Sequence, residues 1–352
     1  MNKAIFLFVL SVMLYSCTND EFGEINDVND SPSMFNKGAF VINEGLFNSG
    51  GGDISWINFE NDSISNEIFR FANNFPPGDI PFHMALIDDF IFLTVNNSGK
   101  IYKLNGNFKV EKTISGIMSP REICIGPNGN LFVSSLYKPY IYVVNAGQGA
   151  LVDSIYTGRP VENLLLHKGK LWATHWSQLA STKTNNVLLV IDPIAKQLSD
   201  SIIVGIEPNS MCIDKNEHIW ILCSGGFDHA ETARLVVVDP VSHNVVRSIQ
   251  FLSANDYPTS LVVNLSGDTL YYINQHIYKM SVNATAIPST HWVQSIGNTF
   301  YRLAVNPADN TIWASDAGNY IHAGKVLHYS PFGSLIKEFN AGVVPGYIIF
   351  KE

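Results

Sequence analysis

The sequence predicts an all-β protein, a seven-bladed β-propeller, and three observations support this fold class. The chain resembles itself at intervals of about 40 to 50 residues, a spacing typical of propeller blades. Turn residues recur about every 8 to 12 residues, and no long stretch shows helical periodicity. The chain is 46% apolar and only 15% charged, which is enough apolar material for one large core.

The repeat is clearest where two segments are set above each other. CIGPNGNLFVSS begins at Cys124 and CIDKNEHIWILCS begins at Cys212, and both run from Cys-Ile through a turn with Asn to an apolar strand ending in Ser. The second halves of the units also recur, as in VLLVIDPIAKQLSDSIIVG from Val187 and RLVVVDPVSHNVVRSIQF from Arg234. IYKMSVNATAIPSTHWV from Ile277 follows the same plan. Four short strands per unit are therefore expected.

Most units open with a proline followed two or three residues later by an apolar residue. Six complete units begin near residues 81, 120, 160, 208, 258 and 300, and only the last lacks the proline. The remaining pieces are three N-terminal strands, Ala39–Asn43, Asp53–Phe59 and Ser63–Phe69, and the C-terminal strand 346–350. Together they make a seventh blade, so that residues 38–352 form a closed ring without exposed sheet edges. Six or eight blades are the alternatives.

The N-terminus predicts a lipoprotein signal peptide over residues 1–16. Lys3 precedes an apolar stretch, Ala4–Tyr15, that is too short to span a bilayer. The sequence Leu14-Tyr15-Ser16-Cys17 resembles a bacterial lipobox, which implies cleavage before Cys17 and acylation of that residue. An ordinary signal peptide followed by an unrelated cysteine is the alternative.

Residues 17–37 are expected to be the acylated cysteine and a flexible tether, because the segment is polar and has no apolar periodicity. Its acidic start, Asp20, Glu21 and Glu24, is similar to the surface-export signal of lipoproteins in the Bacteroidota, although a solvated tail would look the same. The expected location is the outer membrane at the cell surface, with membrane contact through the lipid alone. The net charge of -9 and the scattered basic residues argue against a nucleic-acid partner.

Three cysteines remain after Cys17. A two-residue turn at Asn216-Glu217 would pair Cys212 with Ile221 and leave Cys223 diagonal to Cys212 on the same face, about 7 Å away and too far for a disulfide. The spacing matches no zinc pattern. Three buried free thiols, including Cys124, are expected.

In a propeller, the starts of the innermost strands and the loops joining second to third strands gather on one face around the central channel. We expect a ligand-binding rim there, because this face concentrates aromatic and polar residues. The candidates at strand starts are Phe82, His83, Arg121, Glu122, Glu162, Asn163, Asn209, Tyr301, Arg302 and Tyr347, with Ser210, Thr259 and Ser260 at equivalent positions. The candidates in loops are Glu44, Phe47, Asn48, Tyr137, His175, Trp176, Phe227, Asp228, His229, Tyr320 and His322.

Each group of candidates has a structural alternative. Arg121 with Glu122, and Tyr301 with Arg302, could form a belt of charges inside the channel instead of contacting a ligand. The loop aromatics could pack against their own loops. Trp56, Trp172, Trp220 and Trp313 lie inside predicted strands and are expected in the core.

The rim histidines His83, His175, His229, His276 and His322 could bind a metal, supply acid–base chemistry or coordinate the metal of a ligand, but they come from different blades. We therefore predict no metal site and no cofactor. The chain contains no GxSxG or HExxH motif and no paired carboxylates at a known spacing, so we do not expect an enzyme, although dispersed rim residues leave a lyase or hydrolase open. The glycines of GLFNSGGG precede a strand and not a helix, which argues against a phosphate site.

The repeat resembles the seven-bladed propellers related to YncE and the YVTN repeats. The opening FVINEGLFNSGGGDISWINF, together with the lipobox, resembles the propeller lipoproteins of the Bacteroidota, whose first blade carries Asn-Glu-Gly, an aromatic residue and a Gly/Ser/Asn-rich loop. Asn43, Glu44, Gly45 and Phe47 fit this motif, whereas Leu46 replaces the usual Asn.

The resemblance implies a surface protein that binds a small ligand, with cobalamin or another corrinoid as the best candidate, and passes it to a TonB-dependent outer-membrane transporter. We expect a monomeric propeller. An adhesion or protein-interaction propeller without a small ligand, and a propeller enzyme, are the competing functions.

Overall fold

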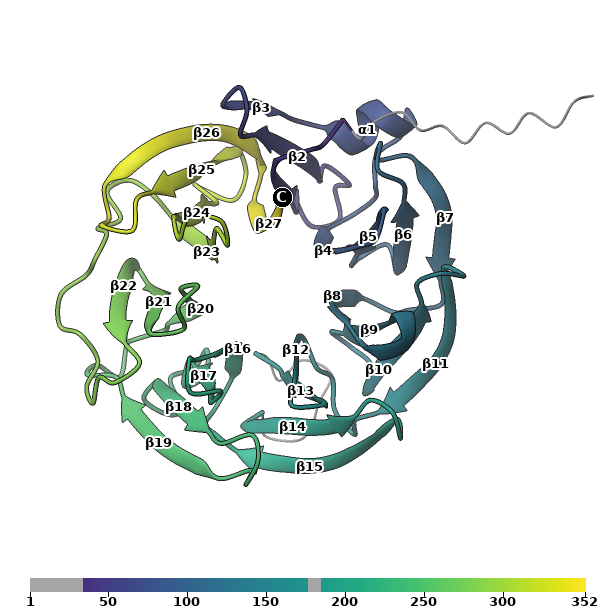
Figure 1. Ribbon diagram of the computed structural model, residues 1–352. Helices are drawn as coiled ribbons and strands as arrows, with labels where there is room; N and C mark the ends of the chain where they lie inside the picture. Colours follow the sequence, from purple (N-terminus) through teal and green to yellow (C-terminus); the bar gives the residue numbers. More distant parts are fainter. Residues whose placement is uncertain (1–33, 177–184) are drawn as a thin grey trace, which may run out of the picture. The chain divides into compact units, whose positions relative to one another are not determined.

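The computed structural model describes residues 34–176 and 185–352, and in this part of the chain 27 strands form seven antiparallel sheets. The sheets are arranged in a ring around a central axis, with the first strand of each blade innermost, as Figure 1 shows. The prediction of an all-β, seven-bladed propeller is confirmed. Among the described residues no helix is long and apolar enough to cross a membrane.

Each sheet is a simple meander that runs from the channel outward. Three sheets comprise β4 (Pro81–Ile87), β5 (Phe90–Val95), β6 (Lys100–Leu104) and β7 (Val110–Ser115); β8 (Pro120–Ile125), β9 (Asn130–Ser135), β10 (Tyr140–Asn145) and β11 (Ala150–Tyr156); and β12 (Asn163–His167), β13 (Lys170–Thr174), β14 (Val187–Asp192) and β15 (Gln197–Ile203). Three more comprise β16 (Pro208–Ile213), β17 (Ile219–Cys223), β18 (Arg234–Val238) and β19 (Val245–Gln250); β20 (Thr259–Val263), β21 (Thr269–Asn274) and β22 (His276–Ser281); and β23 (Phe300–Val305), β24 (Ile312–Asp316), β25 (Ala323–Tyr329) and β26 (Leu335–Val343).

The seventh sheet closes the ring with strands from both ends of the described chain. Its order is β27 (Pro345–Lys351), β1 (Gly38–Asn43), β2 (Asp53–Asn58) and β3 (Ser63–Ser65). Ala39 pairs with Phe350 and Val41 pairs with Ile348, so the predicted closure by residues 346–350 is confirmed. This pairing gives β1 a partner on both sides, so that the edge of β1 is not open for another chain to extend.

The core lies between neighbouring blades. Each of seven hydrophobic clusters in the described residues joins two adjacent sheets, because the strands are apolar on both faces. The predicted core tryptophans are buried: Trp56, Trp172, Trp220 and Trp313. The innermost strand of every blade contacts the innermost strands on either side, from β4 round to β27 and back to β4. These contacts hold the channel residues in fixed relative positions.

The prediction of a strand over Ser63–Phe69 is wrong in its second half. Strand β3 ends at Ser65, and the short helix α1 (Ile68–Asn73) follows it. The carboxylate of Asp53 accepts hydrogen bonds from the backbone N–H groups of Phe69 (3.0 Å) and Arg70 (3.2 Å), which stabilises the first turn of the helix. The ring of Phe69 is thereby buried between two blades.

The blade that contains β20 to β22 has three strands in the described structure, whereas the repeat predicted four. After β22 the chain makes only one bridge back to the sheet, between Ile277 and Val293. Pro288 in this segment has no N–H group for a ladder, and Trp292 packs on Tyr271 with ring centroids 5.0 Å apart. The segment from 282 to 299 therefore covers the sheet edge as an irregular chain.

The predicted register at the cysteines is wrong by one residue. Cys212 pairs with Trp220 and not with Ile221, because the turn is longer and the N–H of Asp214 donates to the carbonyl of His218. Cys212 and Cys223 consequently face different interblade clusters. Both are buried free thiols, as predicted, whereas Cys124 is free but only partly buried.

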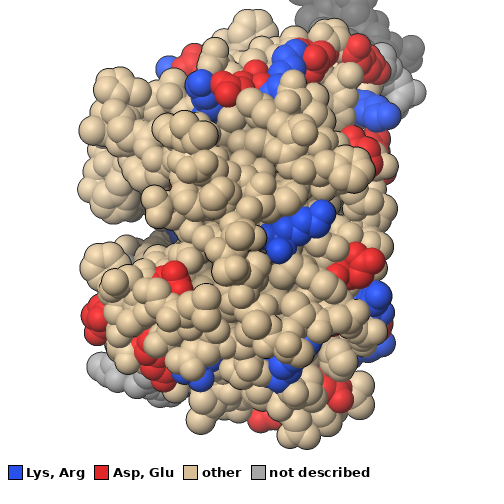
Figure 2. Space-filling view, turned by 90° about the vertical axis from the view of Figure 1, so that its left-hand side faces the viewer, with Lys and Arg blue, Asp and Glu red and all other residues tan. Residues whose placement is uncertain are grey.

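The folded body begins earlier than the predicted tether boundary. Phe35 is buried against Phe40, Trp56 and Phe108, so residues 34–37 belong to the propeller. Cys17, the signal peptide and most of the tether lie outside the described residues. Figure 2 shows acidic and basic side chains interspersed on one outer face of the molecule, without a continuous basic patch on that face. This distribution suits the overall charge of -9.

Candidate functional site: a pocket on the channel rim

The innermost strands begin with irregular backbone that points side chains into the channel. The register shifts at the start of β4, β8, β16, β20 and β23. Such bulges turn a side chain away from the regular alternation. Four residues that directly precede a proline have a positive φ, between 50° and 58°: Ile80, Ser119, Glu207 and Val344. This conformation is costly for a β-branched residue, so the surrounding structure must hold it in place.

Hydroxyl groups on the second strands fix the backbone of the channel residues. Thr94 Oγ1 donates to the carbonyl of Arg121 in the next blade (2.8 Å), and Ser134 Oγ donates to the carbonyl of Glu162 (2.6 Å). Ser315 Oγ accepts the N–H of Arg302 (3.0 Å). The backbone of Arg121 and Glu162 is therefore held by the neighbouring blade, whereas that of Arg302 is held by the second strand of its own blade.

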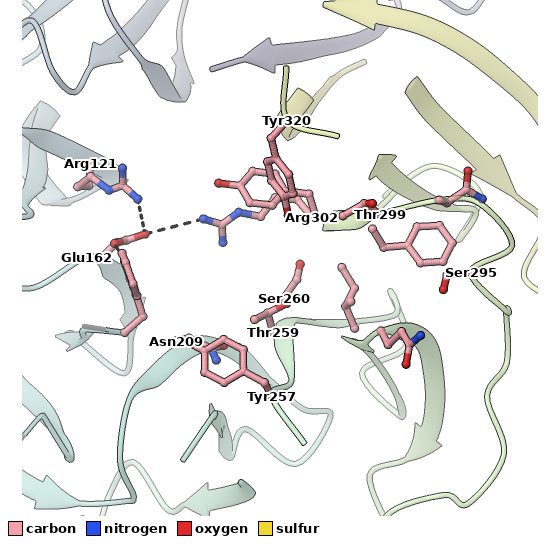
Figure 3. Close-up of a pocket in the computed structure, with 16 residues that line it drawn as sticks. Arg121, Glu162, Asn209, Tyr257, Thr259, Ser260, Ser295, Thr299, Arg302 and Tyr320 are labelled. Carbon is pink, nitrogen blue, oxygen red and sulfur yellow. Dashed lines mark hydrogen bonds and ion pairs between the residues drawn. The ribbon is translucent and has the colours of Figure 1, made fainter. Parts of the chain in front are cut away.

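Three of the predicted residues form a charged cluster at the channel, which Figure 3 shows with both arginines pointing toward the carboxylate. Arg121 Nη2 lies 2.9 Å from Glu162 Oε1, and Arg302 Nη2 lies 3.8 Å from the same oxygen. The Trp176 indole N–H donates to the other oxygen of Glu162. Burial alone would raise the pKa of Glu162, but the guanidinium groups of Arg121 and Arg302 lower it.

Aromatic rings support the two arginines from below. The guanidinium carbon of Arg121 lies 3.3 Å from the ring centroid of Phe82, and that of Arg302 lies 4.4 Å from the centroid of Tyr347. Both contacts are cation–π interactions, which are strongest where water is excluded. Burial opposes the charged form of Arg302, but the neighbouring Tyr347, Tyr301 and Glu162 hold its pKa above the usual value.

Two further carboxyl groups lie beside this cluster. The carboxylate of Glu122 accepts hydrogen bonds from the Tyr347 hydroxyl, from the Asn163 amide (2.8 Å) and from the N–H of Leu164 (3.1 Å). Glu44 is buried as well, and its Oε1 has no hydrogen-bond partner among the described residues. Burial raises the pKa of Glu122 and of Glu44, since desolvation disfavours the charged carboxylate.

The histidines of the channel are held in the neutral form. Burial, with a smaller contribution from Arg302, lowers the pKa of His83 to about 3. Burial also lowers the pKa of His175 to about 4, although Glu162 opposes this shift. Nδ1 of His83 accepts the N–H of Ile123 (3.3 Å), which requires an unprotonated nitrogen.

A cavity of about 680 Å³ opens beside the charged cluster. It is lined by Arg121, Glu162, Trp176, Asn209, Tyr257, Thr259, Ser260, Ile273, Gln275, Ser295, Asn298, Thr299, Phe300, Tyr301, Arg302 and Tyr320. Nine of the residues predicted for the rim are among these, with Thr259 and Ser260 included. The mixture of aromatic rings, amides, hydroxyls and a few charges is typical of a small-molecule site.

Seven lining residues were not among the residues predicted for the rim: Ile273, Gln275, Phe300, Tyr257, Ser295, Asn298 and Thr299. The last three come from the irregular segment that takes the place of a fourth strand after β22. Because the repeat predicted a strand there, these side chains were not expected at the rim. The missing proline before Phe300 was the one irregularity in the sequence that marked this region.

Other predicted rim residues lie away from the cavity. Phe47 and Phe227 are 61% and 82% exposed, and neither lines the cavity. Asn48 donates its N–H to Asp79 (2.9 Å), and Tyr137 lines a separate shallow depression. Asp228, His229 and His322 are exposed in their loops, and the loop that follows Trp176 lies partly outside the described residues.

The rim histidines contact different partners. His83 packs against Tyr347, His229 lies near Tyr257, His276 contacts His291 and His322 lies 2.9 Å from the Asn319 amide. Among the described residues no group of three or more His, Cys, Asp or Glu side chains is arranged to hold a metal ion.

Comparison with known proteins shows the fold and no closer relationship. No protein-family model matches the chain, and no curated protein matches it. A quinonprotein alcohol dehydrogenase-like protein from Bacteroides thetaiotaomicron superposes with a TM-score of 0.67 at 12% identity, covering 90% of this chain and 79% of its own.

A protein from Lactobacillus plantarum gives a TM-score of 0.68 at 11% identity, covering 90% of this chain and all of its own (100%). Virginiamycin B lyase from Staphylococcus aureus gives 0.59 at 10% identity over 77% of this chain and 91% of its own. At these identities the likeness is one of fold alone. The chain is similar to these proteins as a β-propeller.

Proposed function

We propose that this protein is a ligand-binding propeller that takes a small organic molecule into the cavity on its channel rim. The observation that carries the proposal is the convergence of Arg121, Glu162 and Arg302 with a cavity of about 680 Å³. Pockets of this size lined by aromatic rings and a few oriented polar groups usually bind a small ligand.

Cobalamin or another corrinoid is the first ligand to test, because the opening blade resembles that of the cobalamin-binding propeller lipoproteins. The cavity would hold one part of such a large ligand, and the remainder would lie on the rim loops. We further propose that the protein is anchored in the outer membrane through acylated Cys17, at the cell surface, and that it passes its ligand to a TonB-dependent transporter.

The test is a titration of the purified propeller with cyanocobalamin, followed by calorimetry and thermal denaturation. Tyr320 lines the cavity and is partly exposed, so Tyr320→Ala should weaken binding without unfolding the protein. Phe332→Ala is the matched control, because Phe332 is an exposed aromatic on a third-to-fourth strand hairpin at the opposite face. Absence of heat and of a thermal shift at micromolar concentrations would exclude the corrinoid.

Exposed aromatic side chains on the rim favour a second candidate function, that of a protein-interaction propeller. Phe47 and Phe227 present apolar rings to solvent, and aromatic residues are enriched at protein interfaces. Replacing both by Ser should abolish capture of a protein partner under this hypothesis and leave small-ligand binding unchanged.

A further inference from the structure

The guanidinium group of Arg302 lines the cavity with unused hydrogen-bond donors. Its nearest carboxylate among the described residues is that of Glu162, and the distance of 3.8 Å is longer than a hydrogen bond. Nε of Arg302 is buried without a partner in the described structure. Nε of Arg121 is also buried without a partner in the described structure, but Nη2 of Arg121 already donates to Glu162 at 2.9 Å. Arg302 makes no such side-chain hydrogen bond among the described residues, so it is the arginine that we assign to another acceptor.

Ser260 supplies a second donor on the same cavity wall. Its hydroxyl oxygen accepts the N–H of Leu303 (2.8 Å), and among the described residues the hydroxyl proton has no acceptor. The equivalent hydroxyl of Ser210 donates to Asn209 (2.7 Å), so it has no proton left for a ligand. A hydroxyl that already accepts one bond still has its proton to donate.

The charges that line the cavity do not cancel. Among the lining residues Arg121 and Arg302 contribute two positive charges and Glu162 contributes one negative charge, a formal sum of +1. Glu44 and Glu122 lie beside the cluster without lining the cavity, and burial raises the pKa of both toward the neutral form. Burying an uncompensated charge is costly unless a partner neutralises it. A ligand group with one negative charge would balance the site, whereas a phosphate monoester with two would exceed it.

We propose that the ligand of this pocket carries a singly charged oxygen anion, a carboxylate or a phosphodiester, which binds the Arg302 guanidinium and the Ser260 hydroxyl. This inference rests on the proposed function, since it names the chemical class of the ligand for the same pocket. Guanidinium groups bind such anions through two parallel hydrogen bonds. The rings of Tyr257, Phe300 and Tyr320 would then contact the uncharged part of the ligand.

The test compares matched pairs of small molecules that differ in charge. Carboxylates from acetate to indole-3-acetate are each paired with their amide, and these pairs decide the effect of charge. Cyanocobalamin is compared with dicyanocobinamide, which lacks the phosphodiester together with its ribose and base. Thermal denaturation and calorimetry are measured on the wild type and on Arg302→Gln, Arg302→Lys and Arg70→Gln. Arg70 is a half-exposed arginine on α1 whose carboxylate contacts are 3.9 Å long, so its removal is the matched control.

The expected result is that at least one anionic member binds the wild type and Arg70→Gln at least tenfold more tightly than its neutral partner. Arg302→Gln should remove this preference, and Arg302→Lys should retain part of it. Raising the ionic strength should weaken binding of the anionic member to the wild type and leave the neutral member unchanged, which tests the inference even if Arg302→Gln fails to fold.

Two results would overturn the inference. One is failure of every anionic member to bind the wild type more tightly than its neutral partner at millimolar concentration, which would leave the pocket without anion selectivity. The other is an anion preference that Arg302→Gln retains in full. The titration with cyanocobalamin at micromolar concentration separately decides the corrinoid proposal, so the two failures are distinguishable.

Discussion

Glu162 is the residue on which the charged cluster depends, because it accepts from Arg121 and Trp176 and faces Arg302. A buried pair contributes little relative to an apolar substitute, but removing one partner leaves an uncompensated charge. We therefore expect substitution of Glu162, at the centre of the cluster, to lower the free energy of unfolding more than substitutions at the edge of the cluster.

We expect Glu162→Gln to lower the free energy of unfolding by about 3 kcal/mol, since two buried arginines would lose the carboxylate that lies within 4 Å of both. Urea denaturation at neutral pH measures this change. Glu338→Gln is the control, because its ion pair with Lys325 is about as exposed as buried and should be worth less than about 1 kcal/mol. Equal effects of the two substitutions would contradict the role assigned to Glu162.

His83 gives the protein a predictable dependence on pH. Its pKa is about 3 in the folded chain against an ordinary value of 6.5, so the unfolded chain takes up a proton first as the pH falls. The stability that depends on neutral His83 is fully present above about pH 6.5 and is lost progressively down to about pH 3.

We expect His83→Gln to reduce the pH dependence of the free energy of unfolding by roughly 1.4 kcal/mol per pH unit between pH 6 and 4. The measurement is urea denaturation at several pH values in that range. His322→Gln, at an exposed loop position, serves as the control. Parallel pH curves for the wild type and His83→Gln would show that His83 is protonated without cost in the folded state.

Among the elements, β27 matters most for the architecture, because it supplies the innermost strand of the closing blade. Ile348 packs in the same cluster as Val41, Ile57 and Trp313, and β27 also contacts β4 and β23 on either side. Removing β27 would expose the edge of β1 and open two interblade contacts at once.

We expect a chain that ends at Val344 to lose its cooperative fold and to elute as aggregates in size-exclusion chromatography, because an unpaired apolar strand edge associates with other chains. A chain that ends at Phe350 keeps the pairing of Ala39 with Phe350 and should remain monodisperse. A monodisperse, thermally cooperative protein after removal of β27 would disprove the closure as a requirement for folding.

Some of the elements could be predicted from the sequence and others could not. Alternating strands, turn residues and prolines sufficed for the blades and for pairing Ala39–Asn43 with the C-terminus, because these follow from local periodicity. Helix α1 and the missing strand after β22 were not predictable, since they depend on a capping carboxylate from Asp53 and on packing of Trp292. The positive φ of the four residues before prolines could not be predicted, because the four are of different residue types.

The candidate site was predictable to the extent that it is built from repeat positions. Arg121, Glu162 and Arg302 lie at or next to the starts of the innermost strands in three blades, so the repeat predicts that they lie near the channel. The contributions of Ser295, Asn298 and Thr299 come from a departure from the repeat. The rim histidines did not converge on a common centre, because loop lengths and conformations differ between blades.

In the whole molecule, closure of the ring makes the unfolding of each blade depend on both of its neighbours. Every blade shares a hydrophobic cluster with each neighbour, so no blade can unfold without exposing two apolar faces. Open repeat arrays have free ends at which unfolding can begin, and this ring has none.

We therefore expect a single unfolding transition in urea, with coincident midpoints by tryptophan fluorescence and by far-ultraviolet circular dichroism. The buried tryptophans lie in four different blades and report on them together, whereas circular dichroism reports on all the strands. Two separated midpoints would mean that the blades unfold in groups despite the closure.

The irregular segment after β22 has a consequence for how such a protein can diversify. It forms part of the cavity wall, yet the strand ladders depend on it through the one bridge between Ile277 and Val293. Insertions and substitutions between residues 294 and 299, beyond the core residue Val293, can therefore reshape one side of the pocket while the ring and the arginine cluster stay intact. Ligand preference in this architecture can change separately from foldability, and this segment is where a laboratory selection for new ligands should begin.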